Sequence, residues 1–250
     1  MATLYYSQHT LSTASATEEA AGYAATNLGL RSIVQAWRST TTGSNVITLD
    51  FGSDKTMAGI LLQASNLGAA TVGSATAAAY PTFTARGTVT HGVEDNNRRK
   101  AILALSGITA RYLRVTTPGG GSPQDGSAYW SVGTVYAWAS SETVTPGPEL
   151  GISQSFDLPR ITRRLTNGRT AVASTGSPFS RISFEFREKR GTESVRNLVY
   201  QMLTGICGLT LGYSNQPELC WPLEIVAEEI SRDLPEIVFS SLNLELCEAV

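Results

Sequence analysis

The hydrophobic pattern of the chain changes its period between Ser180 and Leu203. In Ser180–Arg187 apolar and polar residues alternate, which is typical of a strand with one buried face. After Gly191 the apolar residues follow the spacing of an amphipathic helix instead; they are Val195, Leu198, Val199, Met202 and Leu203. We therefore expect a strand followed by a helix, with Thr192 able to cap the helix and Gly205 able to end it.

The rest of the pattern predicts short strands separated by turns. In the first half of the chain the predicted strands are Val46–Phe51, Ile60–Leu62, Thr82–Val89, Lys100–Leu105, Arg111–Thr116 and Val132–Trp138. Clusters of Gly, Pro, Asn, Asp and Ser lie between them, at Thr40–Asn45, Gly92–Asn97 and Pro118–Ser127, and predict turns. The small-residue segment Ala69–Ala79 is interpreted as a mobile or partner-covered loop. Trp37, Tyr136 and Trp138 are expected in the core.

A boundary is predicted in Ser140–Leu150, which holds two prolines, a glycine and small polar residues. The expected division is a domain over 1–142, a linker over 143–150 and a second domain over 151–250. Beyond the strand and helix described above, the second domain is predicted to have strands at Leu209–Gly212, Trp221–Ala227 and Ser241–Glu248.

The first domain contains an ordered set of segments between about residues 20 and 138: Ala25–Leu28, Trp37–Ser39, Ile47–Gly52, Ile60–Leu62, Asn66–Leu67, Ala110–Val115 and Val132–Tyr136. In order and spacing this set resembles a discoidin-type, galactose-binding-like jelly roll. The resemblance implies a jelly-roll β-sandwich. The ligand loops of that family vary, so no sugar-contacting residue is carried over.

The second domain combines the Phe184–Phe186 strand before a helix with a closing strand that holds Glu245 and Glu248. Over about residues 155–250 this pattern resembles the tail-tube-like modules of bacteriophage distal and minor tail proteins. It implies a β-sandwich or barrel with one α-helix. The fold class predicted for the chain is thus mainly β, with a jelly-roll domain before a tail-tube-like domain.

Charge is scarce overall and unevenly placed. Charged residues make up 16% of the chain and its net charge is −2, against about 25% charged residues in an average protein. Nine basic and three acidic residues lie between Arg160 and Arg196, whereas Pro217–Val250 holds eight acidic residues and one basic residue. Two interpretations stay open: two solvated faces, or complementary surfaces, either within the domain or between identical neighbours packed head to tail.

The second interpretation predicts a subunit interface. Its candidate residues are Arg160, Arg163, Arg164, Arg169, Glu224, Glu228 and Glu229. Sequence-specific nucleic-acid binding is not expected, because the overall charge is slightly acidic. A signal peptide and a membrane span are not expected either, because the chain lacks a basic segment with an apolar run at its start and any stretch of 18 apolar residues.

Residues for catalysis and cofactor binding are sparse. The two histidines, His9 and His91, lie near no nucleophile motif, and neither a Gly-x-Ser-x-Gly elbow nor a P-loop ending occurs. The three cysteines match no zinc spacing. The segment Glu94-Asp95-Asn96-Asn97 suits either a polar turn, which we favour, or a hard-cation site. We therefore predict no enzyme activity, no catalytic residue, no cofactor and no metal site.

Aromatic residues beside the glycine-rich segment Gly119–Gly126 are the candidate ligand contact. Tyr129 and Trp130 lie shortly after this segment, and such a loop can line a shallow contact with a glycan or a protein. A plain loop is the favoured alternative.

The resemblances together imply a structural virion protein. The expected role is a distal or minor tail protein of a bacteriophage, located in the virion tail and assembled in the host cytoplasm. Its expected partners are further copies of itself in a trimeric or hexameric ring, the tube, hub and tape-measure proteins, and host-surface glycans. The alternative function is a carbohydrate-binding adaptor module without a virion role.

Overall fold

Two compact units make up the chain in the computed structural model. The model describes residues 2–30, 35–90 and 100–144, and thereafter strand segments between residues 153 and 248. The first unit contains residues 1–145 together with 204–222, and the second contains 146–203 and 223–250. The sequence-based division placed 151–250 in one domain, whereas the contacts group residues 204–222 with the N-terminal part.

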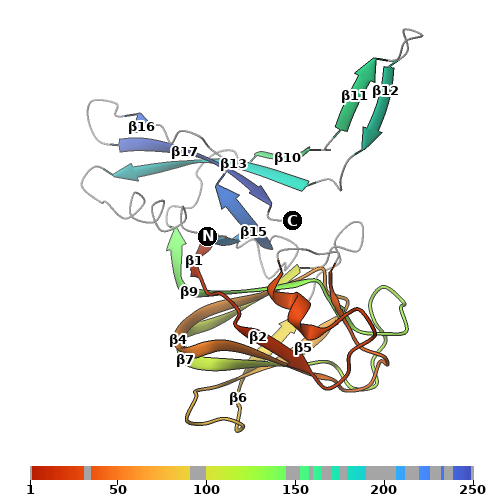
Figure 1. Ribbon diagram of the computed structural model, residues 1–250. Helices are drawn as coiled ribbons and strands as arrows, with labels where there is room; N and C mark the ends of the chain where they lie inside the picture. Colours follow the sequence, from red (N-terminus) through yellow and green to blue (C-terminus); the bar gives the residue numbers. More distant parts are fainter. Residues whose placement is uncertain are drawn as a thin grey trace. The chain divides into compact units, whose positions relative to one another are not determined.

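The first unit confirms the mainly β fold class. Apart from the short 3₁₀ helix η1 (Ala25–Gly29), its described elements are strands (Figure 1). They are β1 (Ala2–Gln8), β2 (Thr13–Ala16), β3 (Trp37–Arg38), β4 (Val46–Gln63), β5 (Ala69–Ala75), β6 (Thr84–Thr90), β7 (Lys100–Thr116), β8 (Ser131–Val132), β9 (Thr134–Val144) and β14 (Cys207–Leu211).

Two long bent strands build the jelly-roll sandwich of this unit. The first half of β4 pairs with β2 and with the second half of β7, which continues to β5 and β6; we call this set layer 1. The second half of β4 pairs with the first half of β7 and with β9, which continues to β1 and β14; this is layer 2. Register shifts in the β4–β7 pairing between Asp50 and Lys55 allow both strands to turn from one layer into the other.

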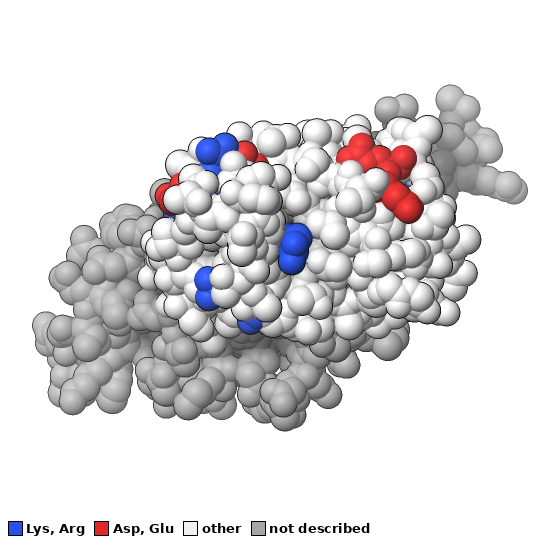
Figure 2. Space-filling model, turned by 90° about the horizontal axis from the view of Figure 1, so that it is seen from below, with Lys and Arg blue, Asp and Glu red and all other residues white. Residues whose placement is uncertain are grey.

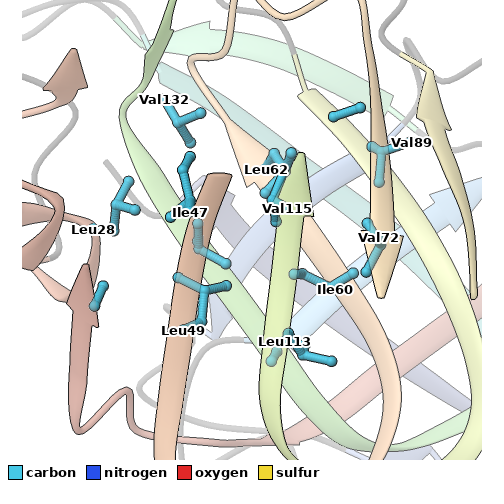
Figure 3. Close-up of a cluster of buried hydrophobic side chains, with 14 of the residues drawn as sticks. Leu28, Ile47, Leu49, Ile60, Leu62, Val72, Val89, Leu113, Val115 and Val132 are labelled. Atoms are coloured by element: carbon cyan, nitrogen blue, oxygen red, sulfur yellow. The ribbon is translucent and has the colours of Figure 1, made fainter. Parts of the chain in front are cut away.

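The core lies between the two layers. Figure 3 shows aliphatic side chains of β4, β5, β6 and β7 pointing toward one another. Along β4, Ile47 and Leu49 are buried whereas Val46, Thr48 and Asp50 are partly exposed, so the predicted alternation of Val46–Phe51 is confirmed. Trp37 is fully buried and belongs to this core, as predicted.

A second buried cluster covers the outer face of layer 2. Tyr136 and Trp138 are buried, as predicted, and their rings stack with centroids 6.1 Å apart. They alternate along β9 with the core residues Val135 and Ala137, so they lie on the opposite face of the strand. The Tyr5 ring lies 5.7 Å from that of Trp138.

Strand β14 completes this outer cluster. It pairs with β1, with Tyr5 opposite Gly208. A Cβ atom placed on Gly208 would lie 2.7 Å from Cη2 of Trp138, so only glycine lets the β14 backbone approach the indole this closely. The segment 204–222 is therefore part of the packing of the first unit.

Three sequence expectations for this unit need correction. The predicted loop Ala69–Ala79 is wrong over Ala69–Ala75, which forms β5 and pairs on both sides with β6 and β7. The predicted strands at 100–105 and 111–116 are two halves of one strand, β7. Strands β1 and β2 were not predicted at all.

The described strands of the second unit form an antiparallel sheet and a separate ribbon. The sheet order is β10 (Ser153–Asp157), β13 (Phe179–Lys189), β17 (Phe239–Glu248) and β15 (Cys220–Ile225), with β16 (Arg232–Asp233) also on β17. The unit boundary crosses β15 after Pro222. These strands confirm the predictions at 180–187, 221–227 and 241–248 to within a few residues, and the predicted helix lies outside the described residues.

The ribbon of the second unit consists of β11 (Arg160–Arg164) and β12 (Thr170–Ser174). These two strands pair with each other, with Arg160 opposite Ser174 and Arg164 opposite Thr170, and they join no other described strand. Figure 1 draws the ribbon as a hairpin of its own.

The register of the strands defines two ends of the first unit. At one end, which we call the loop end, lie the segments 17–24, 39–45, 64–68 and 117–133, where β4 begins and ends. Strand β9 starts here at Thr134 and runs away from the loop end to Val144, two residues into the predicted linker. The chain therefore leaves the first unit away from the loop end.

No helix in the described part of the chain is long and apolar enough to cross a membrane.

Candidate functional site

Arg38 is the central residue of the loop end. It lies on β3, which pairs with β8 so that Arg38 faces Ser131 across the ribbon. Its backbone N–H donates to Tyr23 O (3.2 Å), and its carbonyl accepts from Ala20 N–H (2.8 Å). Both bonds tie the segment 20–23 to β3 and bring the Tyr23 ring beside the arginine.

Two tyrosine rings hold the guanidinium of Arg38. Its Cζ atom lies 3.9 Å from the centre of the Tyr23 ring and 5.0 Å from that of Tyr129. Cation–π contacts of this kind stabilise a guanidinium without using its hydrogen-bond donors. We call Tyr23, Arg38 and Tyr129 the Arg38 stack.

The donors of Arg38 lack acceptors within the described structure. Its Nε atom is buried and has no hydrogen-bond partner there, although buried polar atoms are normally paired. The side chain as a whole is only partly buried, so solvent reaches the stack. A fixed guanidinium with unused donors can bind an incoming oxygen acceptor without first breaking a protein contact.

The buried amide of Asn66 fixes the loop that carries Tyr129. Its Nδ2 donates to Tyr129 O (3.0 Å), Ser127 Oγ (2.9 Å) and Asp125 Oδ1 (3.1 Å), while its Oδ1 accepts from Ser131 N–H (2.7 Å). Asn66 is 3% exposed, and its bonds to Asp125, Ser127, Tyr129 and Ser131 are partly buried. The Tyr129 side of the stack is thereby preorganised.

Two carboxylates at the loop end are held in their charged form. Burial raises the pKa of Asp125, but hydrogen bonds from Ser127 and Asn66 outweigh burial and leave that pKa below its usual value. Hydrogen bonds from Thr40 and Thr41 likewise lower the pKa of Glu18. Both carboxylates serve to order loops, because their oxygens already accept protein donors.

The two aromatic residues proposed from the sequence lie in different environments. Tyr129 is partly exposed and belongs to the Arg38 stack. Trp130 is fully buried; its Nε1 donates to Gly43 O (2.9 Å) and its backbone N–H donates to Ser39 Oγ (2.8 Å). Trp130 therefore supports the loop end from inside and offers no surface to a ligand.

Sequence reasoning did not identify Tyr23, Arg38 or Asn66 as site residues. Arg38 and Asn66 lie within segments of the jelly-roll pattern, but only their order along the chain was used. A partial signal was present, since Arg38 follows the buried Trp37 directly and must therefore point to the other face of β3. The pairing of Tyr23 with Tyr129 depends on tertiary structure alone.

The remaining candidate residues lie in the second part of the chain or outside the described residues. Arg160, Arg163 and Arg164 are on β11, and Glu224 is on β15, opposite Cys247 of β17. Arg169, Glu228, Glu229 and the segment Glu94–Asn97 lie outside the described residues. Among residues that the structure describes, no three His, Cys, Asp or Glu side chains gather in a way that could hold a metal ion.

Charged groups are few on the described surface. Figure 2 shows one face on which basic and acidic side chains form small separate groups in a mostly uncharged surface.

Comparison with known proteins gives no family assignment. No family model matches the chain, and no curated protein matches it.

Solved structures of carbohydrate-binding modules are similar to about half of the chain. The chitosan-binding module 1 from a chitosanase/glucanase of Paenibacillus sp. IK-5 is 22% identical with a TM-score of 0.45, over 53% of this chain and 99% of that module. The family 32 CBM of C. perfringens NanJ, in complex with galactose, is 17% identical with a TM-score of 0.43, over 56% and 99%. CBM32 of AlyQ, in complex with 4,5-unsaturated mannuronic acid, is 16% identical with a TM-score of 0.43, over 54% and 100%. The ligands in these names belong to those proteins.

Proposed function

We propose that the first unit is a carbohydrate-binding module that binds a saccharide at the Arg38 stack. The observation that carries the proposal is the partly exposed guanidinium of Arg38, which contacts two tyrosine rings and has no hydrogen-bond acceptor among the described residues. Saccharides present hydroxyl oxygens that accept hydrogen bonds and C–H faces that pack on aromatic rings. The stack offers donors and rings within one small area.

The position of the stack agrees with this role. It lies at the loop end, whereas β9 leads the chain out of the unit at Val144, away from that end. A ligand on a cell surface can therefore approach the stack without passing the point where the chain leaves the unit. Loops on a rigid β-scaffold are the usual place for binding residues.

The first prediction concerns Arg38. On a glycan array, the Arg38→Ala variant of the full chain is expected to lose at least about tenfold in apparent affinity for the glycans that the unaltered chain binds. Arg38→Lys is expected to recover little, because lysine lacks the planar set of donors that packs on the tyrosine rings. Circular dichroism verifies that the variants are folded.

Ser53→Ala is the matched control, since Ser53 is exposed and lies near the β4 bend, away from the loop end. It is expected to bind like the unaltered chain. Equal binding by Arg38→Ala and the unaltered chain would remove the basis of this proposal.

A second candidate function is a structural role in a bacteriophage tail. The ribbon of β11 and β12 favours it, because a two-stranded ribbon without further partners is marginally stable in water and this one carries Arg160, Arg163 and Arg164. A neighbouring copy with an acidic surface, including Glu224, Glu228 and Glu229, would stabilise it. The chain would then be a distal or minor tail protein in the virion, forming a trimeric or hexameric ring and contacting tube, hub and tape-measure proteins.

The second prediction tests this assembly. Mass photometry of the full chain is expected to detect a ring of three or six copies, and replacing Arg160, Arg163 and Arg164 together with Ser is expected to shift the distribution to monomers. Lys55→Ser is the control, because it removes a cation from the first unit. A chain that is monomeric at every concentration would contradict the assembly role and leave the glycan-binding proposal in place.

A further inference from the structure

A second aromatic cluster lies on layer 1, away from the loop end. We call Tyr80, Phe83, Tyr112 and Arg114 the Tyr80 platform. The Tyr80 ring lies 4.5 Å from the Tyr112 ring in a tilted stack and 6.0 Å from the Phe83 ring in an edge contact. The Arg114 guanidinium lies 4.5 Å from the centre of the Phe83 ring. These residues come from β7 and from the turn that joins β5 to β6.

Tyr80 is exposed although its ring is held in place. It is 51% exposed, and among the large apolar residues of the described structure only Leu30 is comparably exposed. Its ring already rests against Tyr112. A ligand that packs on the exposed side of the ring therefore costs the Tyr80 side chain little conformational entropy. An exposed, preordered aromatic ring has no evident role in the core of the unit.

The backbone around Tyr80 is also fixed. Tyr80 N–H donates to Thr76 O (3.2 Å), Thr82 N–H donates to Ala79 O (2.8 Å), and Ala77 N–H donates to Asp54 Oδ1 (2.7 Å). These bonds close the turn over 76–82 and tie it to the bend of β4. The platform is therefore a rigid feature of the surface.

An ion pair supports the ring of Tyr112 from β4. Arg111 binds both carboxylate oxygens of Asp50, at 2.8 and 2.9 Å, and its guanidinium lies 4.8 Å from the centre of the Tyr112 ring. Arg111 is thus used within the protein. Arg114 has no hydrogen bond or ion pair within the described structure, so its donors are open to a ligand.

The surroundings of the platform limit the size of its ligand. Next to Tyr80 the exposed positions are the small or compact residues Ala77, Ala78, Ala79, Pro81 and Thr82. A stable protein partner needs about 800 Å² on each side, with several large anchors, whereas here one ring is open. One sugar ring matches this area, with its C–H face on the ring of Tyr80.

We propose that the Tyr80 platform is a second saccharide site, which takes a carboxylated sugar ring. The sugar ring packs on Tyr80, and its carboxylate accepts hydrogen bonds from the unpaired guanidinium of Arg114. This proposal extends the proposed function to a second place in the first unit, and it rests on that function only for the class of ligand.

The distance between the two sites follows from the register. Strand β5 runs from the loop end to the turn that carries Tyr80, over 7 residues, which corresponds to roughly 20 Å of extended chain. The two sites therefore share no residue and can be tested separately.

The third prediction uses trigalacturonate as the probe in an NMR titration of the full chain labelled with ¹⁵N. Shifts are expected for the amides of Ala79, Thr82 and Arg114. Tyr80→Ala is expected to weaken the affinity read from these amides by at least about tenfold, and Tyr80→Phe, which keeps the ring, to retain most of it. Arg114→Gln is expected to remove the preference for trigalacturonate over neutral galactotriose.

Controls separate this site from the Arg38 stack and from general anion binding. Leu30→Ala changes the other exposed large apolar residue and is expected to have no effect, and Arg38→Ala is expected to leave the Tyr80 amides titrating. Unchanged shifts in Tyr80→Ala, or equal shifts with triglutamate as the probe, would overturn the second site. Loss of binding in Arg38→Ala at the loop-end amides alone would support the proposed function independently.

Discussion

Single polar side chains decide the shape of the loop end. Asn66 is buried and donates to or accepts from Asp125, Ser127, Tyr129 and Ser131, so replacing it with an apolar residue would leave several buried groups without partners. Arg38 is the opposite case, because its buried Nε has no partner in the described structure. A protein retains such a buried, unpaired atom at a cost in stability.

The fourth prediction concerns His9. Its Nε2 lies 2.7 Å from Thr56 O, and burial, aided by the charge of Lys55, lowers its pKa although the hydrogen bond to Thr56 opposes the shift. The unfolded chain therefore binds more protons than the folded one below about pH 6.5. The free energy of unfolding is expected to fall as the pH drops from that value through the lowered pKa of His9.

Urea unfolding at pH 7.5 and pH 5.0 measures this effect. His9→Gln keeps a donor but cannot titrate, so it is expected to flatten the change between the two pH values. His91→Gln serves as the comparison for the other histidine of the chain. A pH dependence that persists in His9→Gln and disappears in His91→Gln would contradict the assignment.

At the scale of elements, the alternation of apolar and polar residues predicted strands correctly where neighbouring side chains differ strongly in polarity. Strands β4, β13 and β17 were predicted because Leu, Ile and Phe alternate with Thr, Asp, Ser and Glu. Strand β5 was missed because its residues are small. Ala70, Val72 and Ser74 are nevertheless buried, and Gly73 lies under Phe83, whose Cβ would be 3.3 Å from a Cβ on Gly73. Its small residues reflect close packing, which composition alone interprets as a loop.

The candidate site was predictable only in part for a related reason. Tyr129 and Trp130 were both predicted as a ligand contact because they lie beside a glycine-rich segment. The sequence does not tell which of the two rings faces inward. The structure buries Trp130 against Ser39 and Gly43 and leaves Tyr129 beside Arg38. Residues 23, 38, 66 and 129 are brought together by tertiary contacts across more than 100 positions, and no local pattern specifies such contacts.

At the scale of the whole molecule, the chain enters the second unit and returns to the first. Strand β14 follows β13 in sequence but pairs with β1 of the first unit. Its Gly208 packs on Trp138, and Gly59 admits the Tyr5 ring in the same way, with a Cβ there only 2.6 Å from Cε1 of Tyr5. The packing contact thus links Trp138 to a segment of the same unit that lies more than 60 residues downstream.

The fifth prediction tests this link at Gly208. Gly208→Ala places a methyl group 2.7 Å from Cη2 of Trp138, and overpacking of this kind costs about 1–3 kcal/mol. The free energy of unfolding, followed by tryptophan fluorescence in urea, is expected to fall by that amount.

Adding Trp138→Phe removes the clashing part of the indole, so the double variant is expected to lose less stability than the sum of the losses of the two single variants. Gly119→Ala is the control, because its new methyl group would meet only the Ser44 side chain, with Cβ at 3.4 Å and Oγ at 4.0 Å, and its effect is expected within about 0.5 kcal/mol. Equal stability of Gly208→Ala and the unaltered chain would mean that β14 does not pack on Trp138 in solution.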